Sequence, residues 1–168
     1  MPAPSPARRA TVLVVEDDAP TRDRLARAVA ADERLVLLGA CATVAEATAR
    51  LAREAPDVLL TDLGLPDGSG VDVIRRARAA GDRTQAMVVT IFGDEETVVR
   101  AIEAGATGYL LKDATLRAIG DGIAELLEGG SPISPSIARL LLRRVAAARD
   151  GPPATLRRRG PAARGRRS

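Results

Sequence analysis

The sequence predicts one doubly wound α/β domain, in which helices cover both faces of a five-stranded parallel sheet. The length of 168 residues suits a single domain with a short extension, since a second full domain would need its own core. Apolar β-branched runs alternate with helical patterns from Thr11 to about Glu128, as is typical of βαβ units with right-handed crossovers. Nearly all apolar residues are Ala, Val, Leu or Ile, so we expect an aliphatic core.

Five strands are predicted from short apolar runs, and five helices fill the remaining intervals. The first helix should follow residues 17–20 and bury Leu25 and Val29 on one face. The fourth should begin near residues 94–96, where carboxylates suit the positive end of the helix dipole, and end at Gly105. The strands are expected at Thr11–Val15, Leu35–Gly39, Val58–Thr61, Ala86–Ile91 and Gly108–Leu111.

The chain changes character after Gly129 and Gly130. Residues 131–136 indicate a turn or helix start, and a short amphipathic helix is expected within a linker over residues 131–148. Its apolar face should contain Ile137, Leu140, Leu141 and Val145. Pro, Gly and Arg dominate residues 149–168, which we expect to be a disordered tail, as we do residues 1–9, leaving residues 10–130 as the folded domain.

The net charge of +3 comes from the C-terminal tail. From Arg149 onward there are seven Arg and one Asp, so residues 1–148 carry 18 basic against 21 acidic groups, a net of −3. The tail could contact nucleic acid or another anionic surface, but clustered charge more often marks a solvated segment.

Composition also excludes several kinds of site. The chain has no His and a single Cys, which rules out an internal disulfide and the usual zinc and His-based catalytic arrangements. Cys41 is therefore expected to be a small core residue. No run of about 18 apolar residues could span a bilayer, and the N-terminus lacks the apolar stretch of a secretion signal. We expect a soluble, cytoplasmic protein with no membrane partner.

Polar side chains stand at the carboxyl ends of four predicted strands, the edge where ligands of such sheets bind. They are Glu16 and Asp17 after the first strand, Asp62 after the third, Thr90 on the fourth and Lys112 after the fifth. Converging carboxylates repel one another unless a cation lies among them, and oxygen-only ligands favour Mg²⁺. A carboxylate beside Mg²⁺ could accept a phosphoryl group as an acyl phosphate.

Lys112 is the only lysine among the 25 Lys and Arg residues. Because every other basic residue is Arg, this ammonium at a strand end suggests a site that requires a compact point charge.

Each of these residues also has a purely structural interpretation. Glu16 and Asp17 could be an acidic helix start, and Asp62 could be a loop carboxylate ahead of a Leu-Pro-Asp-Gly turn. Thr90 could be an ordinary strand residue and Tyr109 a part of the core. The coincidence at four strand ends favours the functional interpretation.

Four motifs resemble the receiver domains of two-component response regulators, and together they cover roughly residues 10–130. They are Val12–Asp18 (VLVVEDD), Thr61–Gly70 (TDLGLPDGSG), Val88–Asp94 (VVTIFGD) and Gly105–Asp113 (GATGYLLKD). Each is modest alone, but four in this order on successive strands are specific. The resemblance implies a flavodoxin-like sheet with strand order 2-1-3-4-5. Asp113, where many receivers have Pro, is common in the NarL/LuxR-type subgroup.

The resemblance also implies a Mg²⁺ site. Asp17 would bind the ion directly, with Asp62, and Glu16 would act through a metal-bound water. The backbone carbonyl of Gly64 would supply a further ligand.

The remaining roles concern phosphorylation and the switch that it drives. The resemblance makes Asp62 the phosphoacceptor, with Thr90 and Lys112 binding phosphate oxygens. Tyr109 matches a switch aromatic whose ring moves inward as Thr90 closes on the phosphate, changing the surface of the last two strands and helices.

Three functions follow as hypotheses. The first is a phosphoprotein of a two-component phosphorelay, with Asp62 phosphorylated by a sensor histidine kinase, since a chain without His cannot be its own donor. A homodimer would form through the face of strands four and five or through the linker helix.

The second is a DNA-binding transcription regulator. Residues 130–139 resemble the stretch before a NarL/LuxR-type reader, but no helix-turn-helix pattern follows, so the output domain is expected to be absent or truncated in this chain. The third is an enzyme such as an aspartyl phosphatase. Gly64 stands where such enzymes usually have a second acid, so we expect only self-phosphorylation and slow autodephosphorylation.

Overall fold

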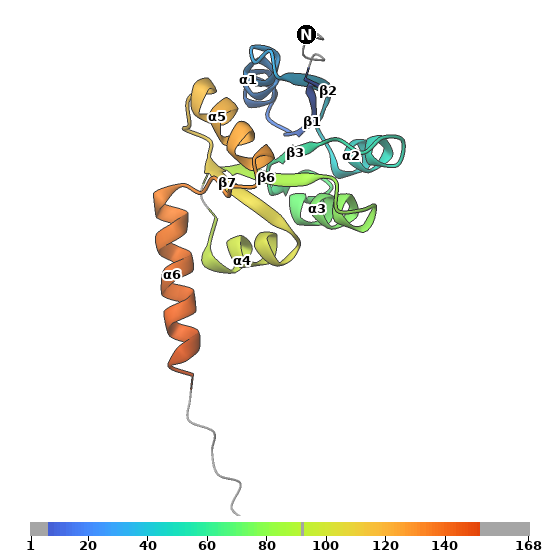
Figure 1. The fold of residues 1–168 in the computed structure, drawn as a ribbon. Helices are drawn as coiled ribbons and strands as arrows, with labels where there is room; N and C mark the ends of the chain where they lie inside the picture. The colour runs from blue at the N-terminus through green and yellow to red at the C-terminus, as the bar shows by residue number, and fades with distance from the viewer. Residues whose placement is uncertain (1–6, 92, 152–168) are drawn as a thin grey trace, which may run out of the picture.

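A five-stranded parallel sheet runs through the middle of the protein, with helices packed on both faces (Figure 1). The computed structural model describes residues 7–91 and 93–151. Its strands lie in the order β2-β1-β3-β6-β7 and every neighbouring pair is parallel, which confirms the predicted fold and the order 2-1-3-4-5. The strands are β1 Ala10–Val15, β2 Leu35–Cys41, β3 Val58–Thr61, β6 Gln85–Thr90 and β7 Ala106–Leu111.

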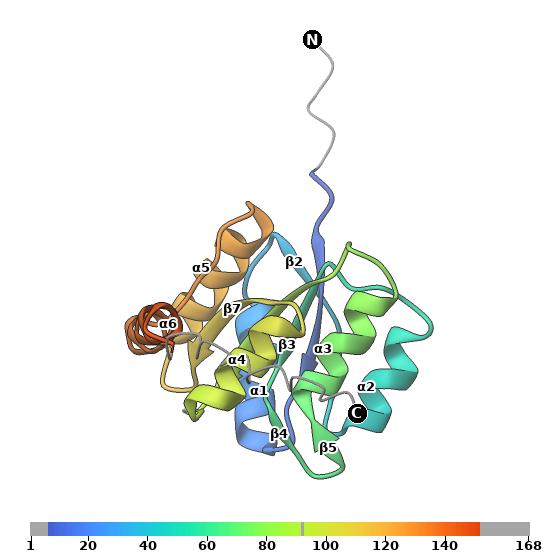
Figure 2. The ribbon, with the colours of Figure 1, turned by 90° about the horizontal axis from the view of Figure 1, so that it is seen from below.

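Two helices cover one face of the sheet and the others cover the opposite face (Figure 2). On the first face, α1 and α5 bury Leu25, Val29 and Ile123 against strand side chains. On the second face, α2, α3 and α4 enclose a larger apolar cluster. The bounds are α1 Ala19–Ala30, α2 Val44–Leu51, α3 Gly70–Ala79, α4 Glu95–Glu103 and α5 Leu116–Leu127.

Local capping determines where these helices begin. A side-chain oxygen at each N-cap accepts a hydrogen bond from a backbone N–H in the first turn, and the capping residues are Asp18, Thr43, Ser69, Asp94 and Thr115. The predicted start of the fourth helix is confirmed, whereas the first helix begins at Ala19, inside the segment that it was expected to follow. The helix before Gly105 ends as predicted, since Gly105 adopts φ +116°.

The structure corrects several predicted strand bounds. β2 continues to Cys41 instead of ending at Gly39, and β1 and β6 each begin one residue earlier than predicted. Ile91, which was assigned to a strand, lies beyond the end of β6 and is 76% exposed. β7 begins two residues earlier than predicted, because Ala106 pairs with Ala86. A hairpin of β4 (Gly64–Leu65) and β5 (Gly68–Ser69) was not predicted, since strands of two residues carry no alternation to detect.

The linker after α5 lies along the free edge of β7 and pairs with it through one isolated parallel bridge, between Tyr109 and Ile133. The N–H of Tyr109 donates to the carbonyl of Pro132 at 2.8 Å, and the N–H of Ser134 donates to the carbonyl of Tyr109 at 3.0 Å. Helix α6 (Pro135–Arg149) follows and packs against α4. The linker thereby satisfies an edge that would otherwise present unpaired backbone groups.

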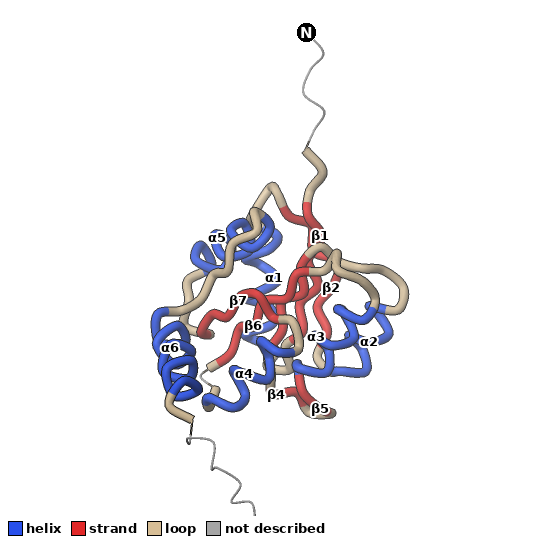
Figure 3. Tube along the Cα trace, turned by 60° about the horizontal axis from the view of Figure 1, so that its bottom comes forward, coloured by secondary structure: helices blue, strands red, loops and turns tan. Residues whose placement is uncertain are grey.

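Only the first part of α6 rests on the domain, and the rest projects away from it (Figures 1 and 3). Ile137 and Leu140 are buried and Leu141 is partly buried, as expected. The assignment of Val145 to the buried face is wrong, since this side chain is 64% exposed where the helix projects past the domain. Most of the predicted disordered segments, residues 1–6 and 152–168, lies outside the described residues.

Two expectations from composition can be compared with the structure. Cys41 is buried at the end of β2, as predicted, and burial raises the pKa of its thiol. Within the described ranges, every helix is too short or too polar to cross a bilayer.

Asp57 fastens the amino-terminal edge of the sheet, opposite the predicted site. Its carboxylate accepts hydrogen bonds from the backbone N–H of Thr11 at 2.8 Å and from the Thr11 hydroxyl at 3.0 Å. Arg8 and Arg83 lie 3.5 and 3.3 Å away. Burial raises the pKa of Asp57, but the Thr11 hydrogen bonds and the two arginines outweigh burial, so the pKa lies below its usual value.

Asp57→Ala should lower the free energy of unfolding at pH 7 by about 1–3 kcal/mol, because the partly buried N–H and hydroxyl donors of Thr11 lose their acceptor. A lowered folded pKa stabilises above the unfolded pKa of about 3.9, and this contribution is lost as the pH falls through the folded pKa. In urea unfolding, the difference between wild type and variant should therefore shrink below about pH 4. Asp82→Ala, whose side chain is 97% exposed, is the control; an equal loss there would contradict the prediction.

Candidate functional site

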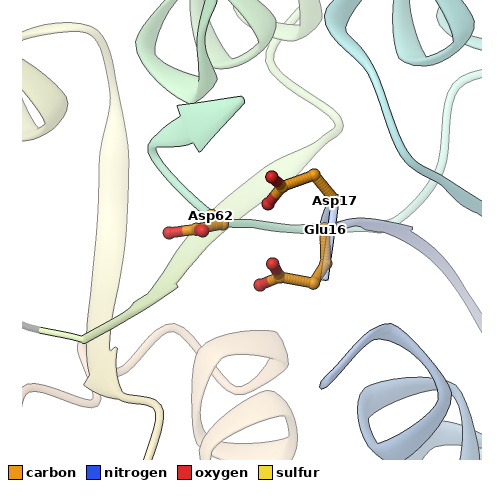
Figure 4. Close-up of side chains that lie close together, drawn as sticks. All are labelled: Glu16, Asp17 and Asp62. Atoms are coloured by element: carbon orange, nitrogen blue, oxygen red, sulfur yellow. The ribbon is translucent and has the colours of Figure 1, made fainter. Parts of the chain in front are cut away.

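Three carboxylates meet at the carboxyl edge of the sheet (Figure 4). Glu16 and Asp17 follow β1 and Asp62 follows β3, and these strands are adjacent and parallel, with Val15 opposite Thr61. One oxygen of each carboxylate lies within 4.8 Å of the others. Glu16 is fully buried and Asp62 is 6% exposed, whereas Asp17 is open to solvent. The predicted convergence of these side chains is thus present.

Lys112 reaches from the end of β7 to two of these carboxylates. Its ammonium donates to Oδ2 of Asp62 at 2.9 Å and forms an ion pair with Oε2 of Glu16 at 2.9 Å. Burial lowers the pKa of Lys112, but hydrogen bonds and charges from Asp62 and Glu16 outweigh it and leave the pKa above its usual value. Lys112 is therefore cationic at neutral pH and compensates part of the negative charge.

Burial raises the pKa of Glu16, whereas it lowers that of Lys112. The contact with Lys112 and a hydrogen bond from the N–H of Asp18, at 3.1 Å, partly offset this rise. Oε2 of Glu16 is buried and lies 2.9 Å from the Lys112 ammonium, which compensates part of its charge. A buried oxygen of this kind favours a cation or a water beside it.

The donor set fits a hard divalent cation. It consists of carboxylate oxygens, with one exposed group, Asp17, that gives access from solvent. Mg²⁺ prefers such oxygen ligands and retains several waters. The three converging carboxylates, one of them the exposed Asp17, therefore suit Mg²⁺ with part of its water shell retained.

Backbone contacts hold Asp62 in place. Its Oδ1 accepts a hydrogen bond from the N–H of Leu63 at 2.8 Å, and its carbonyl accepts one from the Thr61 hydroxyl at 2.8 Å. Gly70, at the start of α3, packs on the same carbonyl so closely that a Cβ atom there would lie 1.9 Å from the oxygen. The position of Asp62 thus depends on the absence of a side chain at residue 70.

Gly70→Ala should lower the free energy of unfolding by about 1–3 kcal/mol, because the backbone of Asp62 or the start of α3 must shift. It should also slow any reaction at Asp62, since the shifted carbonyl belongs to that residue. Gly64→Ala is the stability control, because no atom lies within 4 Å of its added Cβ. Equal urea midpoints for the two variants would contradict this prediction.

The other predicted site residues surround this cluster. Thr90 ends β6, and its carbonyl accepts a hydrogen bond from the N–H of Lys112 at 2.7 Å, so the two residues lie on adjacent strand ends. Gly64 lies in β4, two residues after Asp62. Their assigned roles as phosphate and metal ligands stay predictions.

Tyr109 is 1% exposed on β7, with its ring already inside the domain. Its buried hydroxyl has no hydrogen-bond partner among residues 7–91 and 93–151. Burial and the charges of Asp62 and Asp94 raise its pKa to about 12. The inward movement assigned to this ring stays a prediction.

Sequence reasoning missed two arginines and a glycine that support the site. Arg22 and Arg24 on α1 donate to backbone carbonyls of the loops that carry the carboxylates and the lysine. Nothing in the sequence distinguishes them from the other arginines of a chain in which nearly every basic residue is Arg. Gly70 was noted only as the last residue of the Thr61–Gly70 motif.

A doubly wound parallel sheet with three carboxylates and a paired lysine at its carboxyl edge defines an α/β domain with an acidic pocket whose oxygen ligands suit a divalent cation. The chain belongs to the response regulator receiver domain family, which matches it over residues 12–124. Receivers of this family are components of two-component systems and bind Mg²⁺ at an acidic pocket; they are generally signal transducers rather than enzymes.

Relatives and solved structures agree with this membership. The chain is 30% identical over 139 residues to the DNA-binding transcriptional activator DevR/DosR of Mycobacterium tuberculosis, covering 83% of this chain and 64% of that protein. It is 34% identical over 131 residues to the response regulator GacA of Pseudomonas aeruginosa, covering 77% and 61%. A LuxR-family two-component response regulator from Aurantimonas sp. SI85-9A1 has a TM-score of 0.74 at 25% identity, covering 82% and 99%.

The signal receiver domain of the putative response regulator NarL from Mycobacterium tuberculosis has a TM-score of 0.68 at 25% identity, covering 73% of this chain and 98% of that domain. The resemblance to NarL/LuxR-type receivers is therefore confirmed. The chain spans less than two thirds of the length of DevR/DosR and GacA.

Proposed function

We propose that this protein is a phosphorylation-dependent response regulator in which Asp62 accepts a phosphoryl group from a partner sensor histidine kinase. The observation that supports this most is the pairing of Asp62 with Lys112 at 2.9 Å inside a three-carboxylate cluster. Asp62 is the member of the cluster that both contacts the lysine and keeps some exposure to solvent, 6% against 0% for Glu16. Cytoplasmic location, and receiver bounds of 10–130 followed by a linker over 131–148, are parts of the same proposal.

Each residue of the site has a separate role in the reaction. A carboxylate oxygen of Asp62 forms a bond to phosphorus while the bond from phosphorus to the donor atom breaks, and the donor leaves with that electron pair. Lys112 and the Thr90 hydroxyl hold the equatorial oxygens. The cation would be held by Asp17, Asp62 and the carbonyl of Gly64, and by Glu16 through a water. Mg²⁺, when bound, neutralises charge on the phosphoryl oxygens.

The phosphorylated state is read out at β7 and the linker. When Thr90 closes on the phosphate, the space around Tyr109 changes, and the Tyr109 backbone is hydrogen-bonded to Pro132 and Ser134. A shift of Tyr109 therefore moves the linker and α6 together. A homodimer through the face of β6 and β7 requires α6 to leave its place beside α4, whereas the projecting part of α6 is accessible in either state.

The test is covalent modification by a small phosphoryl donor. Wild-type protein incubated with acetyl phosphate and MgCl₂ should gain the mass of one phosphoryl group, and beryllofluoride should change hydrogen exchange in the linker and α6. Asp62→Asn should show neither change, because an amide neither attacks phosphorus nor carries the charge. A wild type that gains no mass, or a gain that survives Asp62→Asn, would refute the function.

DNA-binding transcription regulation is the second candidate. It is favoured by similarity to DevR/DosR, which is described as a DNA-binding transcriptional activator, although the chain matches only 64% of that protein. The described residues contain no helix group after α6 that could form a reader. Sequence-specific retardation of DNA at about 150 mM salt would support this candidate, since nonspecific electrostatic binding is weakened there.

A further inference from the structure

We propose that two arginines on α1, Arg22 and Arg24, are positioning residues that hold the metal-binding loop and the lysine-bearing loop, respectively. This inference rests on the proposed function, because it concerns the same site. Neither residue touches the cluster of carboxylates with its side chain. Each acts on the backbone of one loop, so the two should control separable properties of the site.

Arg22 fastens the loop that carries Glu16 and Asp17. Its Nη1 donates to the carbonyl of Glu16 at 3.0 Å and to the carbonyl of Asp17 at 3.1 Å. Consecutive carbonyls tied to one guanidinium have little freedom to rotate. Since these two residues supply two of the three converging carboxylates, the Arg22 contact fixes the directions in which both side chains leave the backbone.

Arg24 fastens the loop that follows β7. Its Nη1 donates to the carbonyl of Ala114 at 2.7 Å, and its Nη2 donates to the carbonyl of Lys112. These bonds join α1 to a loop about 90 residues away in sequence and fix the backbone of Lys112, the residue whose ammonium contacts Asp62. The following residue is Asp113, so no proline ring stiffens the backbone at this point. Arg24 supplies that stiffness from outside the loop.

A guanidinium presents several N–H donors in a fixed plane, whereas a lysine ammonium acts as a point charge on a flexible stem. Arg24 uses both Nη atoms, one for each carbonyl, and Arg22 reaches both of its carbonyls from Nη1. Substitution by Lys should therefore keep the charge near the site but lose part of the positioning. Arg27, on the same helix, is exposed and has no side-chain hydrogen bond or ion pair within the described residues, which makes it a matched control.

The experiment measures two properties on full-length wild type and on Arg22→Ala, Arg24→Ala and Arg27→Ala. Titration calorimetry with MgCl₂ gives the cation affinity without any reaction, and intact mass against time with acetyl phosphate at saturating MgCl₂ gives the phosphorylation rate. Arg22→Ala should weaken Mg²⁺ binding by about 10-fold or more, as outer contacts to ligand loops typically do. Arg24→Ala should slow phosphorylation by a similar factor of about 10 with Mg²⁺ affinity retained.

Arg27→Ala should match wild type in both measurements. Arg22→Lys and Arg24→Lys should recover part of each loss, and they replace the alanine variants if either of those fails to fold. Equal effects of Arg24→Ala and Arg27→Ala on the rate, or identical losses of affinity and rate in both Arg22 and Arg24 variants, would overturn the inference. A wild type that binds MgCl₂ but is never phosphorylated would instead count against the proposed function. The Mg²⁺ affinity of Arg22→Ala would then still test the positioning role of Arg22.

Discussion

Lys112→Ala should slow phosphorylation of Asp62 by acetyl phosphate about 10²–10³-fold, the usual cost of removing one charged donor from a developing oxyanion. The same change should destabilise the protein in the absence of divalent cation. It leaves the fully buried Glu16 and the nearly buried Asp62 without their counter-charge, and breaking a buried pair in this way costs about 3–5 kcal/mol.

A divalent cation should restore part of that stability. Because Mg²⁺ would supply positive charge in the same cluster, MgCl₂ should raise the melting temperature of Lys112→Ala more than that of wild type. Lys112→Arg is the matched variant: it keeps the charge, so stability should be largely retained while the rate still falls. Equal Mg²⁺ effects on wild type and Lys112→Ala would show that the lysine and the cation do not share this site.

Ile137→Ala should have the second largest effect, on stability and on the docking of α6. Ile137 lies on α6 and is fully buried in the apolar cluster that α4 also joins. Its truncation should lower the free energy of unfolding by about 2–5 kcal/mol, through lost burial and a cavity. Hydrogen exchange should report faster exchange throughout α6, and urea unfolding should give the change in free energy.

Leu142→Ala provides the control on the same helix. This leucine is 71% exposed, so its truncation should change stability by less than about 0.5 kcal/mol. Similar results for the two variants would mean that α6 is not fastened to the domain through Ile137. A loss of α6 protection without any loss of global stability would mean that the helix undocks independently of the folded core.

The strand ends could be predicted because a parallel sheet that is covered on both faces restricts its strands to apolar residues. Buried on both faces, such strands appear as short aliphatic runs, and their carboxyl ends must meet at one edge of the sheet. Residues directly after those runs, such as Asp17 and Asp62, are therefore neighbours in space although they are far apart in the chain. For the same reason Lys112 could be placed beside Asp62 before its 2.9 Å contact was seen.

Other features depended on contacts that leave no periodic trace. Val145 has the spacing of a buried helix residue, yet it is exposed, because burial depends on what lies opposite the helix and not on spacing alone. The pairing of the linker with the edge of β7 likewise uses backbone atoms, which every residue possesses.

The sequence by itself determined the strands and the group of residues at the carboxyl edge of the sheet, because hydrophobic period and strand direction fix these, whereas the strand order followed from the resemblance to receiver domains. Only the tertiary structure decided which of the many arginines hold the site, why residue 70 must be glycine, and where α6 rests. Those outcomes depend on atoms brought together from distant segments, such as Arg24 and the carbonyl of Ala114, 90 residues away. Their energies arise from distances and angles that exist only once the chain has folded.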